Sequence, residues 1–424
     1  MTASRRAVLT GIGVVTPIGL DAASFGRSLR EGRGGIHSVH SFDASALPVR
    51  FGGEILNFDA RSYLEKKDRK RLNGMVRTIQ FAVAAAQLAM NDAGLKKDTL
   101  DPARFGVVFG TGTVPGDLVD LGYAGLESLD GSPNRIDMKK WGETGIPRIP
   151  PMWMLNHVPN MAACHVSISH NAQGPNNTIS QTDLGGLLAL GEAFRAVLRG
   201  RADLFLAGGT DAKISPCTMA RQCLFTPLSQ RNDAPERACR PFDRGRDGVV
   251  LGEGGGVLVM EELEHARSRG GRIYAEVLGF GAAFDRSHDG DGVARAARIA
   301  LTEANVGQAD LDHVNAQGYS TPLTDALEAQ ALGEVFGRNG HGVPVFAPKS
   351  YFGNSGAASG PMELAASLLA EADGVLPATL NYEEPDRMCP VEVVREPRPV
   401  TRPCFLKIGF TELGQCAAMV CRKW

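Results

Sequence analysis

The feature that most constrains the fold is the alternation of short apolar runs with segments of helical periodicity along the chain. Apolar runs that favour strands lie at residues 7–15, 105–110, 204–207, 257–261 and 273–279. Apolar residues at helical spacing predict helices at residues 72–93, 184–199 and 292–304. Strands that alternate with helices in this way form mixed or parallel sheets covered by helices, so an α/β fold is predicted.

The chain is long enough for two fused halves. It has 424 residues, which is more than one hydrophobic core usually holds. Near Glu261 the pattern of the first half begins again, with Gly-rich exits after apolar strands. We therefore expect an N-terminal half at residues 1–260 and a C-terminal half at residues 261–424.

Composition argues against several function classes. The formal net charge of -2 gives no electrostatic case for binding nucleic acid. The eight cysteines form no Cys-x-x-Cys pair and do not cluster with the nine histidines, so neither a metal site nor a disulfide scaffold is expected. No apolar stretch approaches the length of a membrane span, and a cytoplasmic protein without a membrane partner is the expectation.

One turn is placed where a reactive side chain is often presented. Residues 174–186 (GPNNTISQTDLGG) predict a strand, a tight turn and the start of a helix, with Asp183 at the tip. An aspartate there has an ordinary structural interpretation, because its side-chain oxygen can accept the unpaired amide hydrogens at the start of a helix. Helix capping is therefore the first hypothesis for Asp183.

Several motifs occur in order along the chain. They are VLTGIGVVTPIG at residues 8–19, ADLFLAGG at 202–209, PFD at 241–243, GEG at 252–254, NAQGYSTP at 315–322 and PKS at 348–350. In sequence and spacing they resemble the β-ketoacyl-acyl-carrier-protein synthase (ketosynthase) family over nearly the whole chain. The resemblance implies the thiolase fold, in which duplicated halves form a five-layer αβαβα sandwich.

The resemblance also implies that the catalytic side chains are lost. Condensing members of the family use a cysteine and two histidines, whereas the matching positions here hold Asp183, Gln317 and Asn354. An ionised aspartate is a poor nucleophile toward thioesters, in contrast to a thiolate at a helix N-terminus. Neutral amides can donate hydrogen bonds but carry neither a proton nor a positive charge. We therefore expect no catalytic residues at these degenerate positions and no autonomous activity.

Residues around the altered positions match the family more closely. Asp325, Glu328 and Lys349 correspond to its buried charged residues, and we expect them to pair and to fix the surrounding loops. Phe410 occupies the place of a gate to the acyl tunnel. In the segment 408–414 (IGFTELG), residues with side chains replace the glycines of that gate, so a stiffer gate is expected.

A ketosynthase-like chain without its catalytic side chains resembles the chain-length factor of type II polyketide and polyene synthases. That resemblance implies a non-catalytic subunit that pairs with an active ketosynthase and shapes the acyl tunnel. The residues that fall where the tunnel is lined across the interface are Thr113, Val114, Leu118, Gly122 and Tyr123. Plain interface packing is an equal alternative for Leu118 and Tyr123.

The implied partners are an active ketosynthase homologue, in a heterodimer, and an acyl carrier protein. No cofactor is expected on this chain, since the carrier's phosphopantetheine arm would be delivered to the partner. The irregular, Pro-rich stretch at residues 128–154 is predicted to be a loop, and in the family such insertions build the dimer interface.

Two other functions remain open from the sequence. The chain is an independent acyl-transfer or cyclising enzyme if Asp183 acts as a general base and Gln317 and Asn354 act as oxyanion donors. It is a homodimeric binding module if it holds an acyl chain without reaction.

Overall fold

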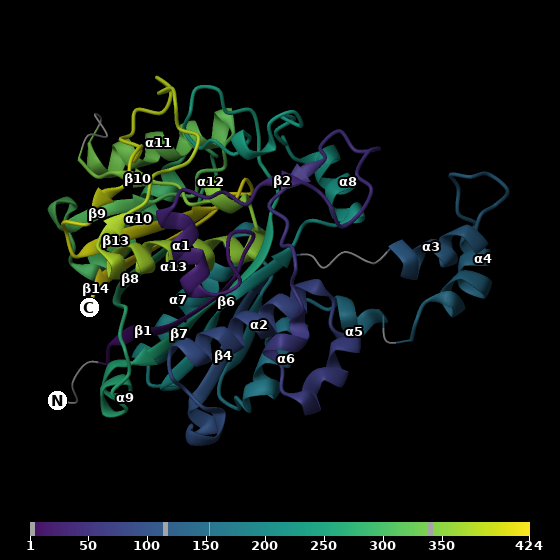
Figure 1. Cartoon of the computed structure of the whole chain (residues 1–424), viewed down its shortest axis with the longest axis horizontal. Coiled ribbons are helices and arrows are strands. Elements are labelled where there is room, and N and C mark those ends of the chain that lie inside the picture. The colour runs from purple at the N-terminus through teal and green to yellow at the C-terminus, as the bar shows by residue number, and fades with distance from the viewer. Residues whose placement is uncertain (1–4, 113–117, 152, 338–341) are drawn as a thin grey trace.

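The computed structural model describes residues 5–112, 118–151, 153–337 and 342–424. Within these ranges ten strands form one continuous sheet in the order β10-β9-β13-β14-β8-β1-β7-β6-β4-β5 (Figure 1). The strands are β1 (Ala7–Val15), β4 (Phe105–Thr111), β5 (Asn176–Ile179), β6 (Leu204–Ala212), β7 (Glu253–Glu262), β8 (Ala275–Phe284), β9 (Leu311–Asn315), β10 (Val345–Phe346), β13 (Cys404–Phe410) and β14 (Gln415–Lys423).

The strand order shows the duplication that was predicted. β1-β7-β6-β4-β5 and β8-β14-β13-β9-β10 follow the same order along the chain and across the sheet, with the same sequence of antiparallel and parallel pairs. The two halves join where β1 pairs with β8, from Ala7 opposite Val277 to Leu9 opposite Ala275. The predicted boundary after residue 260 stays a prediction.

Helices cover the sheet in three layers. α2 (Arg77–Asp92) and α6 (Met161–His170) pack on the outer face of the first half, and α10 (Asp291–Ala304) and α11 (Pro322–Phe336) lie on the other outer side. α7 (Gly185–Leu198) and α13 (Ser359–Asp373) contact strands of both halves and form the central layer. Together with the two half-sheets this gives the αβαβα order, which confirms the predicted fold.

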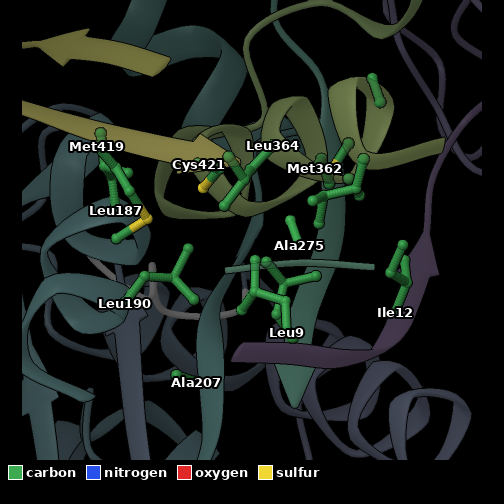
Figure 2. Packing of buried hydrophobic residues seen from close by; sticks show 14 of the residues in the cluster. Leu9, Ile12, Leu187, Leu190, Ala207, Ala275, Met362, Leu364, Met419 and Cys421 are labelled. Atoms are coloured by element: carbon green, nitrogen blue, oxygen red, sulfur yellow. The ribbon is translucent and has the colours of Figure 1, made fainter. Parts of the chain in front are cut away.

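The central layer owes its position to apolar side chains that face both halves. Leu187 and Leu190 of α7, and Met362 and Leu364 of α13, are buried against strand residues such as Leu9 and Met419 (Figure 2). Burying a side chain of this size contributes about 1.5–3 kcal/mol. These contacts fix the start of α7, and hence the turn before it, against the second half of the chain.

The remaining helices and strands are short. They are α1 (Ala22–Arg30), α8 (Pro216–Phe225), α9 (Leu263–Ser268), α12 (Lys349–Phe352), and the strand pairs β2 (His37–Ser38) with β3 (Phe51–Gly52) and β11 (Val375–Leu376) with β12 (Arg398–Pro399). In the described residues, no helix combines the length and the apolar character needed to span a bilayer.

An arm stands away from the sheet at α3 and α4 (Figure 1). The prediction of an irregular loop at residues 128–154 is wrong in part, because α3 (Leu118–Glu127) is followed by α4 (Met138–Lys140), a π-helical turn (Trp141–Gly145) and α5 (Trp153–His157). Asp137 starts α4 by accepting hydrogen bonds from the amides of Lys139 and Lys140. This capping residue lies among prolines and charges that otherwise favour a loop.

Candidate functional site

The turn at residues 180–184 joins β5 to α7, as the sequence predicted. It contains the 3-10 turn η7 (Thr182–Leu184) directly before α7. Thr182 has a φ of 41°, a left-handed conformation that is rare for a β-branched residue. Such backbone strain persists only where the surroundings enforce it, and it is concentrated at functional sites.

The carboxylate of Asp183 is held by three side chains. The Lys213 ammonium donates to Oδ1 at 2.7 Å, the Asn354 amide donates to Oδ2 at 2.9 Å, and the Tyr319 hydroxyl donates to Oδ2 at 3.0 Å. The capping hypothesis for Asp183 is wrong, because Leu184 is the N-cap residue of α7 and no side chain caps that helix. The carboxylate faces the second half of the chain instead.

The electrostatic environment keeps Asp183 ionised. Burial by itself would raise the pKa of this carboxyl, but the Lys213 ammonium and the hydrogen bonds from Lys213 and Asn354 lower the pKa to about 2. Burial opposes the charge of Lys213 as well, yet the Asp183 and Asp211 carboxylates raise the pKa of Lys213 above its usual value. The two groups therefore form a largely buried ion pair at neutral pH, with the Lys213 and Asp183 side chains 11 % and 15 % exposed at the cavity.

Lys213 was missed by the sequence analysis because the predicted strand ended too early. The predicted strand ended at Ala207, but β6 continues through Gly208 and Gly209 to Ala212. A Cβ on Gly209 would lie 2.0 Å from the carbonyl oxygen of Ala357, so glycine here permits close packing rather than a turn. The charged residues Asp211 and Lys213, directly after the glycines, were the available signal.

A second buried carboxylate lies beside this ion pair. Burial raises the pKa of Asp211 to about 6, with the Asp183 charge adding to the shift and Lys213 opposing it. The backbone leaves little room here, since a Cβ on Gly356, whose φ is 58°, would lie 2.0 Å from an Asp211 carboxylate oxygen. Asp211 therefore gains or loses its proton near pH 6, whereas the neighbouring Asp183 stays ionised there.

Asp183 opens onto a cavity of about 430 Å³. Among the described residues its lining consists of Gly112, Thr182, Asp183, Asp211, Lys213, Cys217, Thr218, Arg221, Gln222, Thr226, Val249, Leu251, Tyr319, Asn354, Thr411, Glu412 and Leu413. Two of the three degenerate positions, Asp183 and Asn354, therefore share one cavity, and Gln317 is not part of this lining.

Gln317 is instead fixed within the buried loops behind the cavity. Its backbone amide donates to Glu328 Oε1 at 2.7 Å, and its carbonyl accepts a hydrogen bond from Lys349 at 2.9 Å. The side-chain Nε2 is buried without a hydrogen-bond partner among the described residues. The structure thus brings Asp183 and Asn354 into direct contact, whereas the Gln317 side chain lies beside Tyr319, which itself contacts Asp183.

Asp325 and Glu328 hold the backbone of the loop that carries Gln317. Asp325 accepts hydrogen bonds from the amides of Ser320 (3.0 Å) and Phe242 (2.8 Å), and Glu328 accepts a second one from Gly318 at 2.9 Å. Burial raises the pKa of Asp325 to about 6 and also raises the pKa of Glu328. Their position supports the expected role in fixing loops.

Lys349 pairs with a carboxylate that the sequence analysis did not identify. Its ammonium contacts Glu363 of α13, and the Lys407 ammonium contacts the other oxygen of the same carboxylate. All three side chains are almost entirely inaccessible to solvent. Lys407 also donates to the carbonyl of Ala316 at 3.1 Å, so this cluster ties β13 and α13 to the Gln317 loop.

Phe410 lies at the end of β13 and contacts Tyr319. Its carbonyl oxygen lies 2.8 Å from the Tyr319 hydroxyl, whose single proton is shared between this carbonyl and Asp183. The two rings meet edge to face with their centroids 5.5 Å apart. The following residues form a tight hairpin turn, in which the amide of Gly414 donates to the carbonyl of Thr411 at 3.0 Å. The expectation of a stiffer gate stays a prediction.

The predicted tunnel residues lie on or before the arm. Thr113 and Val114 fall outside the described residues, as does the side chain of Leu118, whose backbone begins α3. Gly122 and Tyr123 lie on α3, where the Tyr123 side chain is 66 % exposed. Gly122 and Tyr123 are not part of the described lining of the cavity beside Asp183, and their role at a tunnel stays a prediction.

A further buried carboxylate permits a prediction on pH dependence. Both oxygens of Glu371 in α13 are buried without a hydrogen-bond partner in the described part of the chain. Burial raises the pKa of Glu371 from 4.5 to about 7, and the nearby Asp312 adds to the shift. The folded protein thus prefers protonated Glu371, and its stability falls as the pH rises from about 4.5 to about 7.

Replacing Glu371 by glutamine should therefore stabilise the protein only at the higher pH. We expect a gain of about 1–3 kcal/mol in the free energy of unfolding near pH 8 and little change near pH 4. Urea denaturation at both pH values checks this. An equal change at both would mean that the ionisation of Glu371 does not control the effect.

The sequence matches a known protein family along most of its length. Residues 4–266 match the N-terminal domain of β-ketoacyl synthases, and residues 274–383 match their C-terminal domain. The 3-oxoacyl-[acyl-carrier-protein] synthase 2 of Synechocystis is 38 % identical over 92 % of this chain and 91 % of its own. A putative polyketide β-ketoacyl synthase 1 of Streptomyces halstedii is 39 % identical over 96 % of this chain and 95 % of its own.

Two solved ketosynthase structures are similar to this chain over nearly its whole length. The ishigamide ketosynthase/chain length factor superposes with a TM-score of 0.87 at 29 % identity and covers 100 % of both chains. A type II polyketide ketosynthase, solved in complex with its acyl-carrier protein and bound to the hexaketide, superposes with a TM-score of 0.85 at 28 % identity, over 99 % of this chain and 100 % of its own.

Proposed function

Because the chain belongs to the β-ketoacyl synthase family, the acyltransferases of fatty-acid and polyketide biosynthesis, we propose that it is a non-catalytic ketosynthase subunit. In this role it is a chain-length factor, which pairs with an active β-ketoacyl synthase and shapes the tunnel for the growing acyl chain. The acyl carrier protein delivers its phosphopantetheine arm to the active partner.

The observation that carries this proposal is the ion pair between Asp183 and Lys213. The residue at the tip of the turn is a carboxylate whose two oxygens are taken by Lys213, Asn354 and Tyr319. A covalent acyl carrier needs a free and reactive nucleophile at this place. The Asp183 carboxylate is paired with an ammonium group and hydrogen-bonded on both oxygens, so it stabilises the turn and is not available as a nucleophile.

The surface of the arm supports a protein partner. Tyr123, Leu126 and Met138 are 66 %, 66 % and 73 % exposed, and Ile146 nearby is also exposed. Large apolar side chains gathered on a projecting element are typical of an interface rather than of a free surface. A relative that is itself a ketosynthase/chain length factor, with the same fold over its full length, favours a ketosynthase as that partner.

The alternative of an independent enzyme fits the geometry less well. A general base works best with a pKa near the working pH, whereas the pKa of Asp183 is about 2. The Asn354 amide already donates to Asp183, and Gln317 lies outside the cavity lining. The three residues are therefore not arranged as one base and two oxyanion donors.

Co-expression with candidate ketosynthases tests the proposed function. We expect the chain to co-purify with an active ketosynthase as a heterodimer that buries roughly 2,000 Å² or more, the size of an obligate interface. The pure chain, incubated with malonyl-carrier protein, should release carbon dioxide no faster than buffer. Size-exclusion chromatography and a decarboxylation assay measure the two results.

The same experiment separates the three functions. A stable homodimer that ignores every ketosynthase and binds acyl-carrier protein without turnover would favour the binding module. Turnover by the pure chain that is lost in Asp183→Asn would favour the independent enzyme. Either result would overturn the subunit proposal.

Chain length supplies a separate prediction at Tyr123. If the arm walls the partner's tunnel, Tyr123→Ala removes side-chain volume at the end of the growing chain, so the heterodimer should make longer products. Because Tyr123 is exposed on the isolated chain, this variant should retain its own fold. Mass spectrometry of the products is the measurement, and Met138→Ala on the same arm is the control. Unchanged products from the intact Tyr123→Ala complex would mean that Tyr123 only packs the interface.

A further inference from the structure

Three side chains with metal-binding atoms meet at the β2–β3 hairpin. His37 lies on β2, His40 follows it, and Glu54 lies two residues after β3. One ligand atom from each lies within 4.8 Å of the others, and His40 Nδ1 is 3.5 Å from Glu54 Oε2. Two ligands of one ion lie at most about 4 Å apart, since each lies about 2 Å from the ion. The distance between His40 and Glu54 meets this limit, and a separation of up to 4.8 Å requires only a small side-chain movement when the ion binds.

The Glu54 carboxylate is held in place by the backbone. Its oxygens accept hydrogen bonds from the amides of His40 and Ser41, each at 2.8 Å, and the side chain is 2 % exposed. Burial raises the pKa of Glu54, but a hydrogen bond from the Ser41 side chain, the two amide hydrogen bonds and the nearby His37 outweigh it and leave the pKa below its usual value. Each carboxylate oxygen has a second lone pair, so the group remains able to bind a cation.

His37 is held by the backbone, and His40 is open to solvent. His37 Nδ1 lies 2.9 Å from the carbonyl oxygen of Ser38. When Nδ1 donates its proton to that carbonyl, Nε2 carries the lone pair, and an outer hydrogen bond of this kind accompanies most metal-binding histidines. The His40 side chain is 61 % exposed, so an ion can reach the group from solution.

We propose that His37, His40 and Glu54 form a binding site for a divalent transition-metal ion of the zinc class, with water completing the coordination. Two imidazoles and one carboxylate are the donors that Zn²⁺, Co²⁺ and Ni²⁺ accept together. The expectation of no metal site rested on the cysteine pattern, and this site uses no cysteine.

Asp312, His313 and Glu371 form a second group of potential ligands within the described residues, but they are a poorer candidate. Asp312 is occupied by Arg398 and by the amide of Thr401 at 2.8 Å, and His313 is stacked on Phe405 at 5.2 Å with its Nε2 bonded to Ser367. A guanidinium bound to a carboxylate repels a cation. Within the described residues, Glu54 of the hairpin group contacts the amides of His40 and Ser41 and the His40 ring rather than a guanidinium.

The hairpin that would hold the ion is joined by backbone hydrogen bonds to residues near the candidate site. The amide of Gly53 donates to the carbonyl of Leu251 at 2.8 Å, and the amide of Glu253 donates to Gly53 at 3.1 Å. Leu251 lines the cavity beside Asp183. A bound ion would join the residues on either side of the hairpin loop and so limit the motion of this wall.

Titration of the metal-free chain with Zn²⁺, followed by calorimetry, tests the proposal. We expect one site per chain, and thermal unfolding that moves to higher temperature with added Zn²⁺ because the ion binds the folded state. His40→Ala and Glu54→Gln should each weaken binding by at least about tenfold. His40 is exposed, so His40→Ala should fold normally even if Glu54→Gln does not.

His288→Asn is the matched control, because His288 is also an exposed histidine in the described chain and asparagine tolerates its φ of 53°. It should bind Zn²⁺ like the wild type. Substitution with Co²⁺ gives a second measurement, since imidazole and carboxylate ligands produce visible bands without an intense thiolate band. Binding that is unchanged in His40→Ala, or a thiolate band that shows the ion on cysteine, would overturn the proposal.

Discussion

Replacing Lys213 by methionine is expected to lower the free energy of unfolding by about 3 kcal/mol at neutral pH. The substitution keeps the length of the side chain but leaves the Asp183 carboxylate without its cation. The remaining hydrogen bonds from Asn354 and Tyr319 do not replace a full charge. Urea denaturation of the wild type and the variant measures the loss.

At acidic pH the difference in unfolding free energy between the wild type and Lys213→Met should disappear. The pKa of Asp183 is about 2 in the folded protein and 3.8 without its environment. The pair therefore contributes fully above pH 3.8, and its contribution is lost as the pH falls toward about 2. The double variant Lys213→Met with Asp183→Asn should recover much of the lost stability at neutral pH, because no unpaired charge remains.

Arg148→Met is the matched control for this prediction. Arg148 also pairs with a carboxylate, that of Glu127, but both side chains are exposed on the arm. An exposed pair contributes about 0–1 kcal/mol. If Lys213→Met costs no more than Arg148→Met, the ion pair at the turn does not stabilise the fold.

The second large effect is expected at Glu363. Glu363→Gln removes the one carboxylate that both Lys349 and Lys407 contact, and all three side chains are buried. Burial already lowers the pKa of Lys407 against the raising effect of Glu363. Breaking a buried ion pair in this way costs about 3–5 kcal/mol. Calorimetric unfolding at neutral pH is the measurement.

Glu127→Gln, at the exposed pair on the arm, provides the comparison and should change stability by less than about 1 kcal/mol. Adding Lys407→Met to Glu363→Gln should restore part of the stability by removing one of the two unpaired ammonium groups. The interpretation fails if Glu363→Gln is as stable as the wild type, or if Lys407→Met in that background makes the loss larger.

The arrangement of charges explains how the fold retains its site geometry with a carboxylate at position 183. Asp183 sits on a strained turn whose conformation the glycine-rich strands around it enforce. Lys213 forms an ion pair with Asp183 at the tip of this turn. Behind the turn, Glu363 pairs with Lys349 and Lys407 and holds the neighbouring loops in place. The subunit we propose thus has a rigid frame, which suits a protein that shapes a partner's tunnel.

The sequence by itself determined the architecture and the family, and it predicted the loss of the catalytic side chains. Apolar periodicity identified β1 over its full length and α10 to within one residue. Such patterns are local, because buried side chains recur at every second residue along a strand and at every third or fourth residue along a helix. The ordered motifs then identified the family, and the residues at positions 183, 317 and 354 could be read directly.

Only the tertiary structure decided which side chains surround Asp183. Lys213, Tyr319 and Asn354 lie 30, 136 and 171 residues away along the chain, and each is brought to the turn by a different element. Gly208 and Gly209 predicted the end of a strand, but the close approach of Ala357 makes glycine necessary within it. Whether a glycine ends a strand or lets another backbone approach depends on what packs against it, and a local pattern does not contain that information.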